Sequence, residues 1–245
     1  MQTIALYNLK GGVAKTTSCV NFAYMAAKDG YRTLIWDLDP QGAAGYYFKA
    51  EPKKNISRKI FAGDIRLDEA ILDTEFENLD IIPADLSARK LDILIEGSGG
   101  SKKEIRKMLR DMEYKYDFVF VDCAPGFSLL ANNIFTAADA ILMPAIPTTL
   151  SVRTYEMVKQ YLLENEMLDK LACFFTMVDL RKKMHESVMS ELLEDKLFFE
   201  HYIPYLSDIE KMGIQQAPIE EFAKKSYAAI CYRALWEEIK EGVLV

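Results

Sequence analysis

The stretch "YNLKGGVAKTTS" (Tyr7–Ser18) decides how the rest of the sequence is interpreted. It continues an apolar run, "TIALYN" (3–8), and leads into a segment with helical spacing near 16–28. A strand, a glycine-bearing turn and a helix start, in this order, form a concave anion site from backbone N–H groups. The usual phosphate-loop pattern has glycine six residues before the lysine and immediately before it, where this chain has Leu9 and Ala14.

The residue types in this loop suit nucleotide phosphates. Gly11 and Gly12 let the backbone approach oxygen atoms without a Cβ in the way. Lys15 can reach the β- and γ-phosphates, and the Thr16 hydroxyl can take a Mg²⁺ position. Ala14 is the smallest departure from glycine, and we expect it to need only a negative φ. The expected ATP contacts are Lys10, Gly11, Gly12, Val13, Ala14, Lys15, Thr16 and Thr17.

Composition limits the class of protein. The chain has 245 residues, 50% hydrophobic and 27% charged, which suits a single α/β domain over 1–245. No apolar run reaches the ~18 residues that a membrane span needs. The four cysteines are far apart, which favours buried thiols in a reducing compartment over a disulfide or metal set. A net charge of -7 argues against a nucleic-acid binder that uses its whole surface, but it allows a local basic patch.

Apolar, strand-like runs alternate with helix-period segments along the chain. This pattern predicts a three-layer, doubly wound, mostly parallel sheet with helices on both faces. The expected strands are 3–8, 33–39, 79–84, 117–126, 140–146, 171–179 and 198–204. The expected helices lie near 16–28, 86–96, 102–113, 128–137, 150–164, 184–196 and 223–241.

The string "KGGVAKTT" (10–17) resembles the deviant Walker A motif, K-G-G-V-[GA]-K-T-T, of the ParA/MinD family of SIMIBI-class P-loop ATPases. Both departures from the strict pattern are normal in that family. The resemblance implies a P-loop NTPase fold and hydrolysis of ATP to ADP and phosphate. It also implies that Lys10 crosses a nucleotide-sandwich dimer to the partner's phosphates, acting in catalysis with Lys15 and Asp39.

Two further stretches carry the same resemblance. "WDLDPQGAAGYY" (36–47) looks like the family's D-x-D-P-Q-G segment, which implies that Asp39 positions the attacking water and lies near the metal, with Asp37 supporting the magnesium shell. "FVFVDCAPGF" (118–127) resembles the Walker B strand followed by switch II, which implies that Asp122 holds Mg²⁺ through water. Ala124 stands where the family usually has a proline, so we expect a less rigid backbone after Asp122.

The resemblance continues more loosely downstream. "FFTMVDLR" (174–181) and "YIPYLSDIEKMGIQQAPI" (202–219) are similar to segments that supply the family's adenine pocket. The implied adenine contacts are Met177, Pro204 and Tyr205.

ParA-type members bind DNA non-specifically as ATP dimers, through lysine and arginine contacts to phosphates. Gln215 and Gln216 stand where relatives often carry two arginines, which removes two expected charges. The candidate DNA contacts are Arg181, Lys182, Lys211, Lys224 and Lys225, with Arg153, Lys159, Lys183 and Arg233 as further basic positions.

We therefore expect a ParA/Soj-type ATPase without a helix-turn-helix domain before the first strand, cytoplasmic and nucleoid-associated. It would form a homodimer with ATP, and a ParB-like or other partner would stimulate it to position a plasmid, chromosome or other cargo. Alternatives are a MinD-like membrane-recruited ATPase, a metabolic ATP-dependent enzyme and an iron–sulfur protein on the same fold. The acidic C-terminal stretch "ALWEEIKEGVLV" (234–245) disfavours an anionic membrane as partner.

Overall fold

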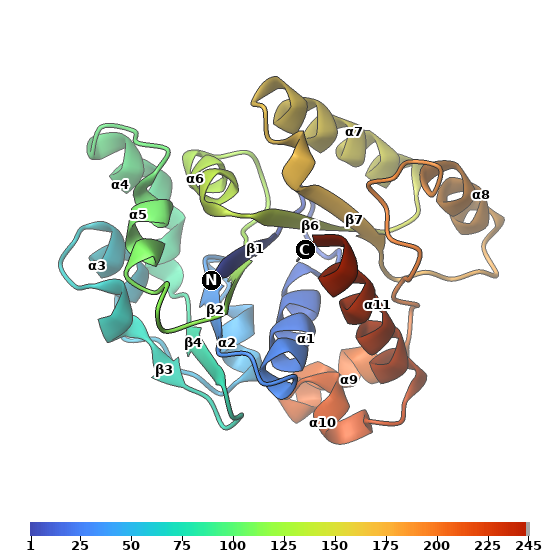
Figure 1. Ribbon diagram of the computed structural model, residues 1–245, viewed down its shortest axis with the longest axis horizontal. Coiled ribbons are helices and arrows are strands. Elements are labelled where there is room, and N and C mark those ends of the chain that lie inside the picture. The colour runs from blue at the N-terminus through green and yellow to red at the C-terminus, as the bar shows by residue number, and fades with distance from the viewer. Residues whose placement is uncertain (244–245) are drawn as a thin grey trace.

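A seven-stranded sheet forms the centre of the computed structural model, which describes residues 1–243 (Figure 1). The strand order is β3-β4-β2-β5-β1-β6-β7, and all neighbouring strands are parallel except β3 and β4. The strands are β1 (Gln2–Leu6), β2 (Thr33–Asp37), β3 (Leu72–Asp73), β4 (Leu79–Ile82), β5 (Phe118–Asp122), β6 (Ala140–Ala145) and β7 (Leu171–Phe175). This architecture confirms the predicted doubly wound fold.

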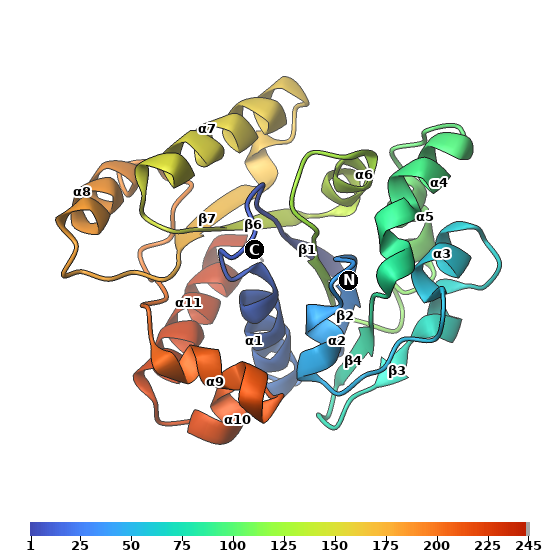
Figure 2. The ribbon, with the colours of Figure 1, turned by 180° about the vertical axis from the view of Figure 1, so that it is seen from behind.

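Helices cover both faces of the sheet, as the two opposite views show (Figures 1 and 2). On one face are α1 (Lys15–Lys28), α2 (Ala43–Tyr47), α9 (Ser207–Gln215), α10 (Ile219–Ala223) and α11 (Tyr227–Val243). On the other are α3 (Ile56–Phe61), α4 (Leu91–Gly97), α5 (Glu104–Arg110), α6 (Leu129–Ala137), α7 (Thr149–Glu164) and α8 (Lys183–Leu192). Short 3₁₀ turns span Leu67–Ala70, Leu86–Lys90 and Leu168–Lys170.

The central strands are buried along their whole length. Every residue of β2, β5 and β6 is buried, as continuous apolar runs such as "FVFVD" predict for strands covered on both faces. The C-terminal helix α11 belongs to this core, because Trp236 is fully buried with its ring 6.0 Å from those of Phe118 and Phe120. The helix α11 therefore completes the hydrophobic core on this face of the sheet.

The expected strand at 198–204 is wrong. The segment makes only isolated parallel bridges, from Phe198 to Cys173 and from Pro204 to Val178. Between them the backbone N–H groups of Glu200 and His201 donate to the carboxylate of Glu238 on α11, at 2.7 and 2.9 Å. A side chain of the last helix thus takes donors that an eighth strand would have used.

Other element boundaries also differ from the expectations. The expected helix at 223–241 is α11, which begins only at Tyr227. The short helices α2, α3, α9 and α10 and the two-residue β3 were not predicted. The expected helices at 102–113 and 184–196 end earlier, at Arg110 and Leu192. These differences lie at helix ends and in short elements, where sequence periodicity carries little information.

Three strands end side by side at the edge of the sheet where the motifs lie. The register pairs Asp122 at the end of β5 with Leu6 of β1 and with Asp37 of β2.

Within residues 1–243 no helix combines the length and the apolar character needed to cross a bilayer. Of the C-terminal stretch 234–245, Leu244 and Val245 lie outside the described residues.

Candidate nucleotide site

The loop between β1 and α1 lies at the carboxyl end of a central strand, where open α/β sheets bind their ligands. Asn8, nearly fully buried, fixes the start of this loop. Its Nδ2 donates to the Pro144 carbonyl at 2.7 Å, and its Oδ1 accepts from the Lys10 N–H at 2.8 Å. The loop therefore leaves the sheet in a defined direction.

The backbone of the loop is more unusual than the sequence suggests. Gly12 has φ 71° and Ala14, directly before the first helical residue, has φ 66°. The expectation of a negative φ at Ala14 is therefore wrong. The left-handed conformation is imposed by the sharp turn from the loop into α1, and an L-residue there carries the strain that glycine would avoid.

Lys15 spans the inside of the loop. Its side chain is buried, and its Nζ donates to the Lys10 carbonyl at 2.9 Å. Burial lowers the pKa of Lys15, and the negative charges of Asp122 and Asp39 oppose that shift. The ammonium group is thus held in the concavity where phosphate oxygens would bind.

The acidic side of the site is formed by β2 and β5. Asp122 is fully buried, and neither of its carboxylate oxygens has a hydrogen-bond partner among residues 1–243. Asp37 is equally buried, but its two oxygens accept from the N–H groups of Asp39 at 3.0 Å and Ala44 at 3.1 Å. Asp37 therefore shapes the loop that carries Asp39, and only Asp122 presents a free buried carboxylate.

Burial raises the pKa of both Asp122 and Asp37. Of the neighbouring charges, the Lys15 ammonium partly opposes this effect at Asp122, whereas the Asp39 carboxylate adds to it. A buried carboxylate without a partner is costly unless a cation neutralises it. The donor set of Thr16, Asp39 and Asp122 therefore fits Mg²⁺, which takes one or two carboxylates and completes its shell with phosphate oxygens and water. Among the described residues, no cluster of three or more His, Cys, Asp or Glu side chains could hold a metal ion.

A cleft of about 240 Å³ opens beside the loop. Its lining residues are Gly11, Gly12, Ala14, Lys15, Thr16, Thr17, Asp39, Gln41, Pro125 and Met177. Val13, also expected to contact ATP, has its side chain buried in the protein and its carbonyl accepting from the Thr176 hydroxyl at 3.2 Å. Val13 is not among the residues that line the cleft.

A smaller apolar pocket of about 60 Å³ adjoins this cleft, since both are lined by Ala14 and Met177. Pro204 and Tyr205 line it too, so the three expected adenine contacts lie together next to the loop. Ile209 and Glu210, which lie in the segment 202–219 expected to supply the adenine pocket, line it as well. Tyr232 of α11 also lines it, and the sequence did not indicate this residue, because it reaches the site only through the tertiary fold.

The basic residues expected to contact DNA lie on several elements, and some of them are paired with acidic side chains. Arg181 is bound by both oxygens of Asp179, at 2.8 and 2.9 Å, and Lys211 by Asp208 at 2.7 Å. Arg233, also considered, pairs with Asp29 and Glu220. Lys182 directly precedes α8, whereas Lys224 and Lys225 follow α10, and these helices lie apart in both views (Figures 1 and 2).

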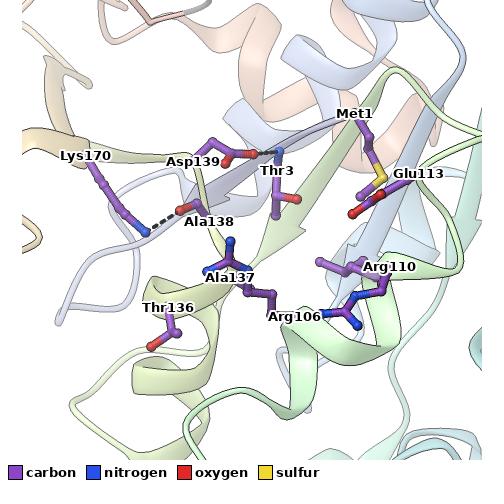
Figure 3. A pocket seen from close by; sticks show the side chains of 11 residues that line it. Met1, Thr3, Arg106, Arg110, Glu113, Thr136, Ala137, Ala138, Asp139 and Lys170 are labelled. Carbon is purple, nitrogen blue, oxygen red and sulfur yellow. Dashed lines mark hydrogen bonds between the residues drawn. The ribbon is translucent and has the colours of Figure 1, made fainter.

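A second cavity, of about 130 Å³, lies at the opposite end of β1 (Figure 3). There Asp139 accepts from the Thr3 N–H at 2.8 Å, and Lys170 donates to the carbonyls of Phe135 and Ala138 at 3.1 and 2.7 Å. These bonds tie the start of β1 and the end of α6 to the strands beside them. Asp139 and Lys170 thus bond to the backbone beside the sheet.

The strain at Ala14 gives a prediction about stability. We expect Ala14→Gly to raise the free energy of unfolding by about 0.5–1 kcal/mol, because glycine adopts this φ without cost while the more flexible unfolded chain offsets part of the gain. Gly12→Ala should lower it by about 1–2 kcal/mol, since a Cβ there meets no atom within 4 Å and only the backbone conformation opposes it. Urea denaturation of nucleotide-free protein measures the free energy of unfolding of both variants. Changes of the same sign in Ala14→Gly and Gly12→Ala would contradict this account.

The buried Asp122 predicts how stability depends on pH in metal-free protein. Its pKa is raised from 3.8 to about 7 in the folded state, so folded protein holds a proton that the unfolded chain has lost within that window. Stability should therefore fall as pH rises from about 4 to about 7. Asp122→Asn should reduce this slope, with Asp37 supplying the remainder because its pKa is also raised by burial, and should be more stable near pH 8 by an amount on the order of a few kcal/mol.

Denaturation in a chelator at about pH 5.5 and about pH 8 measures this effect. Asp64→Asn, at an exposed position, is the control and should keep the slope of the wild type. An unchanged slope in Asp122→Asn would show that another group causes the pH dependence.

Comparison with known proteins agrees with this site. The AAA_31 family model, described as an AAA domain, matches residues 1–170. The chromosome partitioning protein ParA of Myxococcus xanthus is 30% identical over 251 residues, covering 96% of this chain and 87% of that protein. Among solved structures, Cyanothece McdA in complex with ATP superposes with a TM-score of 0.86 at 17% identity, covering 100% of this chain and 97% of that one.

The fold also occurs in a metabolic enzyme. Cobyrinic acid a,c-diamide synthase of Mycobacterium smegmatis, with a bound ATP analogue and magnesium, has a TM-score of 0.77 at 24% identity, covering 97% of this chain and 93% of that one. Structural likeness at this identity shows the fold alone. The family match over 1–170 and the identity to ParA go further, and by them this chain belongs to the ParA/MinD family of P-loop ATPases.

Proposed function

We propose that this protein is a ParA-type ATPase whose dimerisation is controlled by ATP. The observation that carries the proposal is the cleft with a buried ammonium, Lys15, on one side and a buried, unpartnered carboxylate, Asp122, on the other. Such a pair suits a magnesium-bound triphosphate, because the lysine neutralises phosphate oxygens while the aspartate faces the cation. The adjoining apolar pocket at Met177, Pro204 and Tyr205 would take the adenine ring.

The environment of Lys10 supports the proposal of a dimer. Its N–H donates to Asn8 and its carbonyl accepts from Lys15, so its backbone is fixed on both sides. Its half-buried side chain makes no hydrogen bond or ion pair with any other side chain among residues 1–243. A lysine anchored in this way is available to the phosphates of a second copy, and it would make that contact only when a triphosphate is bound.

Hydrolysis would use the groups already in place. Mg²⁺, held by Thr16, Asp122 and Asp39, would neutralise charge that develops on the phosphate oxygens. Asp39 lines the cleft, and its carboxylate can accept a hydrogen bond from a water molecule and orient it. Because Asp37 holds the backbone of this loop through two N–H groups, Asp39 needs little reorganisation.

The cellular role follows from the family. The dimer would bind DNA non-specifically on the nucleoid in the cytoplasm, and a ParB-like or other partner would stimulate hydrolysis and release, so that a plasmid, chromosome or other cargo is positioned. A single domain over 1–245 would perform all of these steps. The membrane alternative is less favoured, because the apolar residues Tyr232, Leu235, Trp236 and Ile239 of α11 are all buried against the sheet.

Two lysine variants test the nucleotide switch. Lys15→Ala should abolish ATP binding, because it removes the cation inside the loop. Lys10→Ala should bind ATP with little change but lose the ATP-dependent dimer, since its contact is made only across the interface. Fluorescent-nucleotide titration and light scattering after gel filtration measure the two properties. Lys53→Ala, at an exposed position, is the control, and a Lys10→Ala protein that still dimerises with ATP would refute the trans contact.

DNA binding is tested by mobility shift with ATP at two salt concentrations. Affinity should fall steeply with salt, and Lys224→Gln with Lys225→Gln should weaken binding and reduce the salt slope by about one for each phosphate that is no longer neutralised. Arg181→Gln should have a smaller effect, because Asp179 already neutralises this guanidinium. Absence of any shift at low salt would reject DNA as a partner.

A further inference from the structure

Tyr7 links the strand that enters the phosphate loop to the loop that follows Asp122. It directly follows β1, is fully buried, and its N–H donates to the Leu142 carbonyl at 3.0 Å. Its hydroxyl donates to the Gly126 carbonyl at 3.1 Å, 119 positions away in the sequence. A residue anchored in the centre of the sheet therefore holds a loop at its edge.

The loop that Tyr7 reaches, residues 123–128, has few other ties. Its first residue bonds back to β1 through the Cys123 N–H and the Leu6 carbonyl, at 3.3 Å, and Ser128 caps the start of α6. Between them, the Tyr7 bond is the one hydrogen bond that reaches 124–127 within residues 1–243. Gly126 has φ 105°, a conformation in which glycine itself has wide freedom.

The position of this loop matters to the cleft. Pro125 lines the cleft, and Asp122 immediately precedes the loop. Aromatic contacts also hold this region. Phe127 of the loop packs against Tyr161, and Tyr7 packs against Phe135, with ring centroids 4.6 Å apart in each pair. Burial raises the pKa of Tyr7, so the hydroxyl remains a donor across the physiological range.

We propose that Tyr7 is a positioning residue for hydrolysis: its hydroxyl holds residues 124–127 where Pro125 forms the wall of the cleft next to Asp122. The inference rests on the proposed function, because it assigns the loop to the ATPase reaction. A single side chain would then keep two walls of the site in register, the phosphate loop that follows β1 and the loop that follows β5. The hydroxyl acts through the loop and does not itself touch the nucleotide.

Tyr7→Phe tests the proposal, since it removes one oxygen and keeps the ring. The first measurement is the alkylation rate of Cys123 in nucleotide-free protein, read for each cysteine by peptide mass spectrometry. Cys123 is buried at the start of the loop, so labelling requires the loop to open. Loss of one hydrogen bond should raise its rate about fivefold. Cys19, buried in α1, is the internal control and should not change.

The second measurement is steady-state ATP hydrolysis. Tyr7→Phe should lower kcat about fivefold while the Kd for ATP is unchanged, because the phosphate loop keeps its own contacts. Tyr161→Phe is the matched control: it also removes a phenolic oxygen beside Phe127, but that hydroxyl bonds to Asn132 and not to the loop. It should leave both the Cys123 rate and kcat near those of the wild type.

The two measurements separate the possible failures. An unchanged Cys123 rate in Tyr7→Phe would overturn the loop contact, and a raised rate with unchanged kcat would overturn its role in hydrolysis. Equal losses in nucleotide affinity and kcat would show a general structural effect and also reject the proposal. A wild-type protein that binds no ATP would instead refute the proposed function, while the alkylation result would still decide the contact between Tyr7 and the loop.

Discussion

The unpartnered carboxylate of Asp122, buried at the end of β5, is the constraint around which this edge of the sheet is organised. Asp122 is fully buried although it ends a strand beside the cleft, so its charge has no solvent to stabilise it. Asp37 on the neighbouring strand adds a second buried acid, and two backbone N–H groups satisfy it. Lys15 supplies the opposing charge from the first loop. A free protein arranged in this way is stabilised by any ligand that brings a cation to Asp122 and anions to Lys15, which links binding to stability.

Much of the fold and of the site follows from sequence patterns. Continuous apolar runs identified the central strands, and the order of strand, glycine turn and lysine placed the loop at the right edge. The resemblance to the family's D-x-D-P-Q-G and Walker B segments implied Asp39 and Asp122, and the structure has Asp122 at the end of β5 and Asp39 two residues after β2, at the same edge of the sheet.

The structural features that the sequence could not predict depend on contacts between residues far apart in the chain. The sign of φ at Ala14 is set by the path from β1 into α1, and alanine gives no sign of it. The missing strand at 198–204 depends on Glu238, about forty residues away in the chain, which captures two backbone donors. Likewise the contact between Tyr7 and Gly126 joins residues 119 positions apart, and no local pattern indicates it. The spread of basic residues over α8 and α10 could be seen only once the helices had positions in space.

The capture of these two donors by Glu238 has a consequence for solubility. β7 is the last strand of the sheet on that side, and an uncovered outer strand offers a row of unpaired amides and carbonyls to any other chain. Here the segment 198–204 lies along β7, to which it bonds through the N–H groups of Phe199 and Ile203, and the Glu238 carboxylate occupies the N–H groups of Glu200 and His201. On the opposite border β3 is only two residues long. Both borders are therefore poor seeds for strand addition, which disfavours one route to aggregation between copies of this protein.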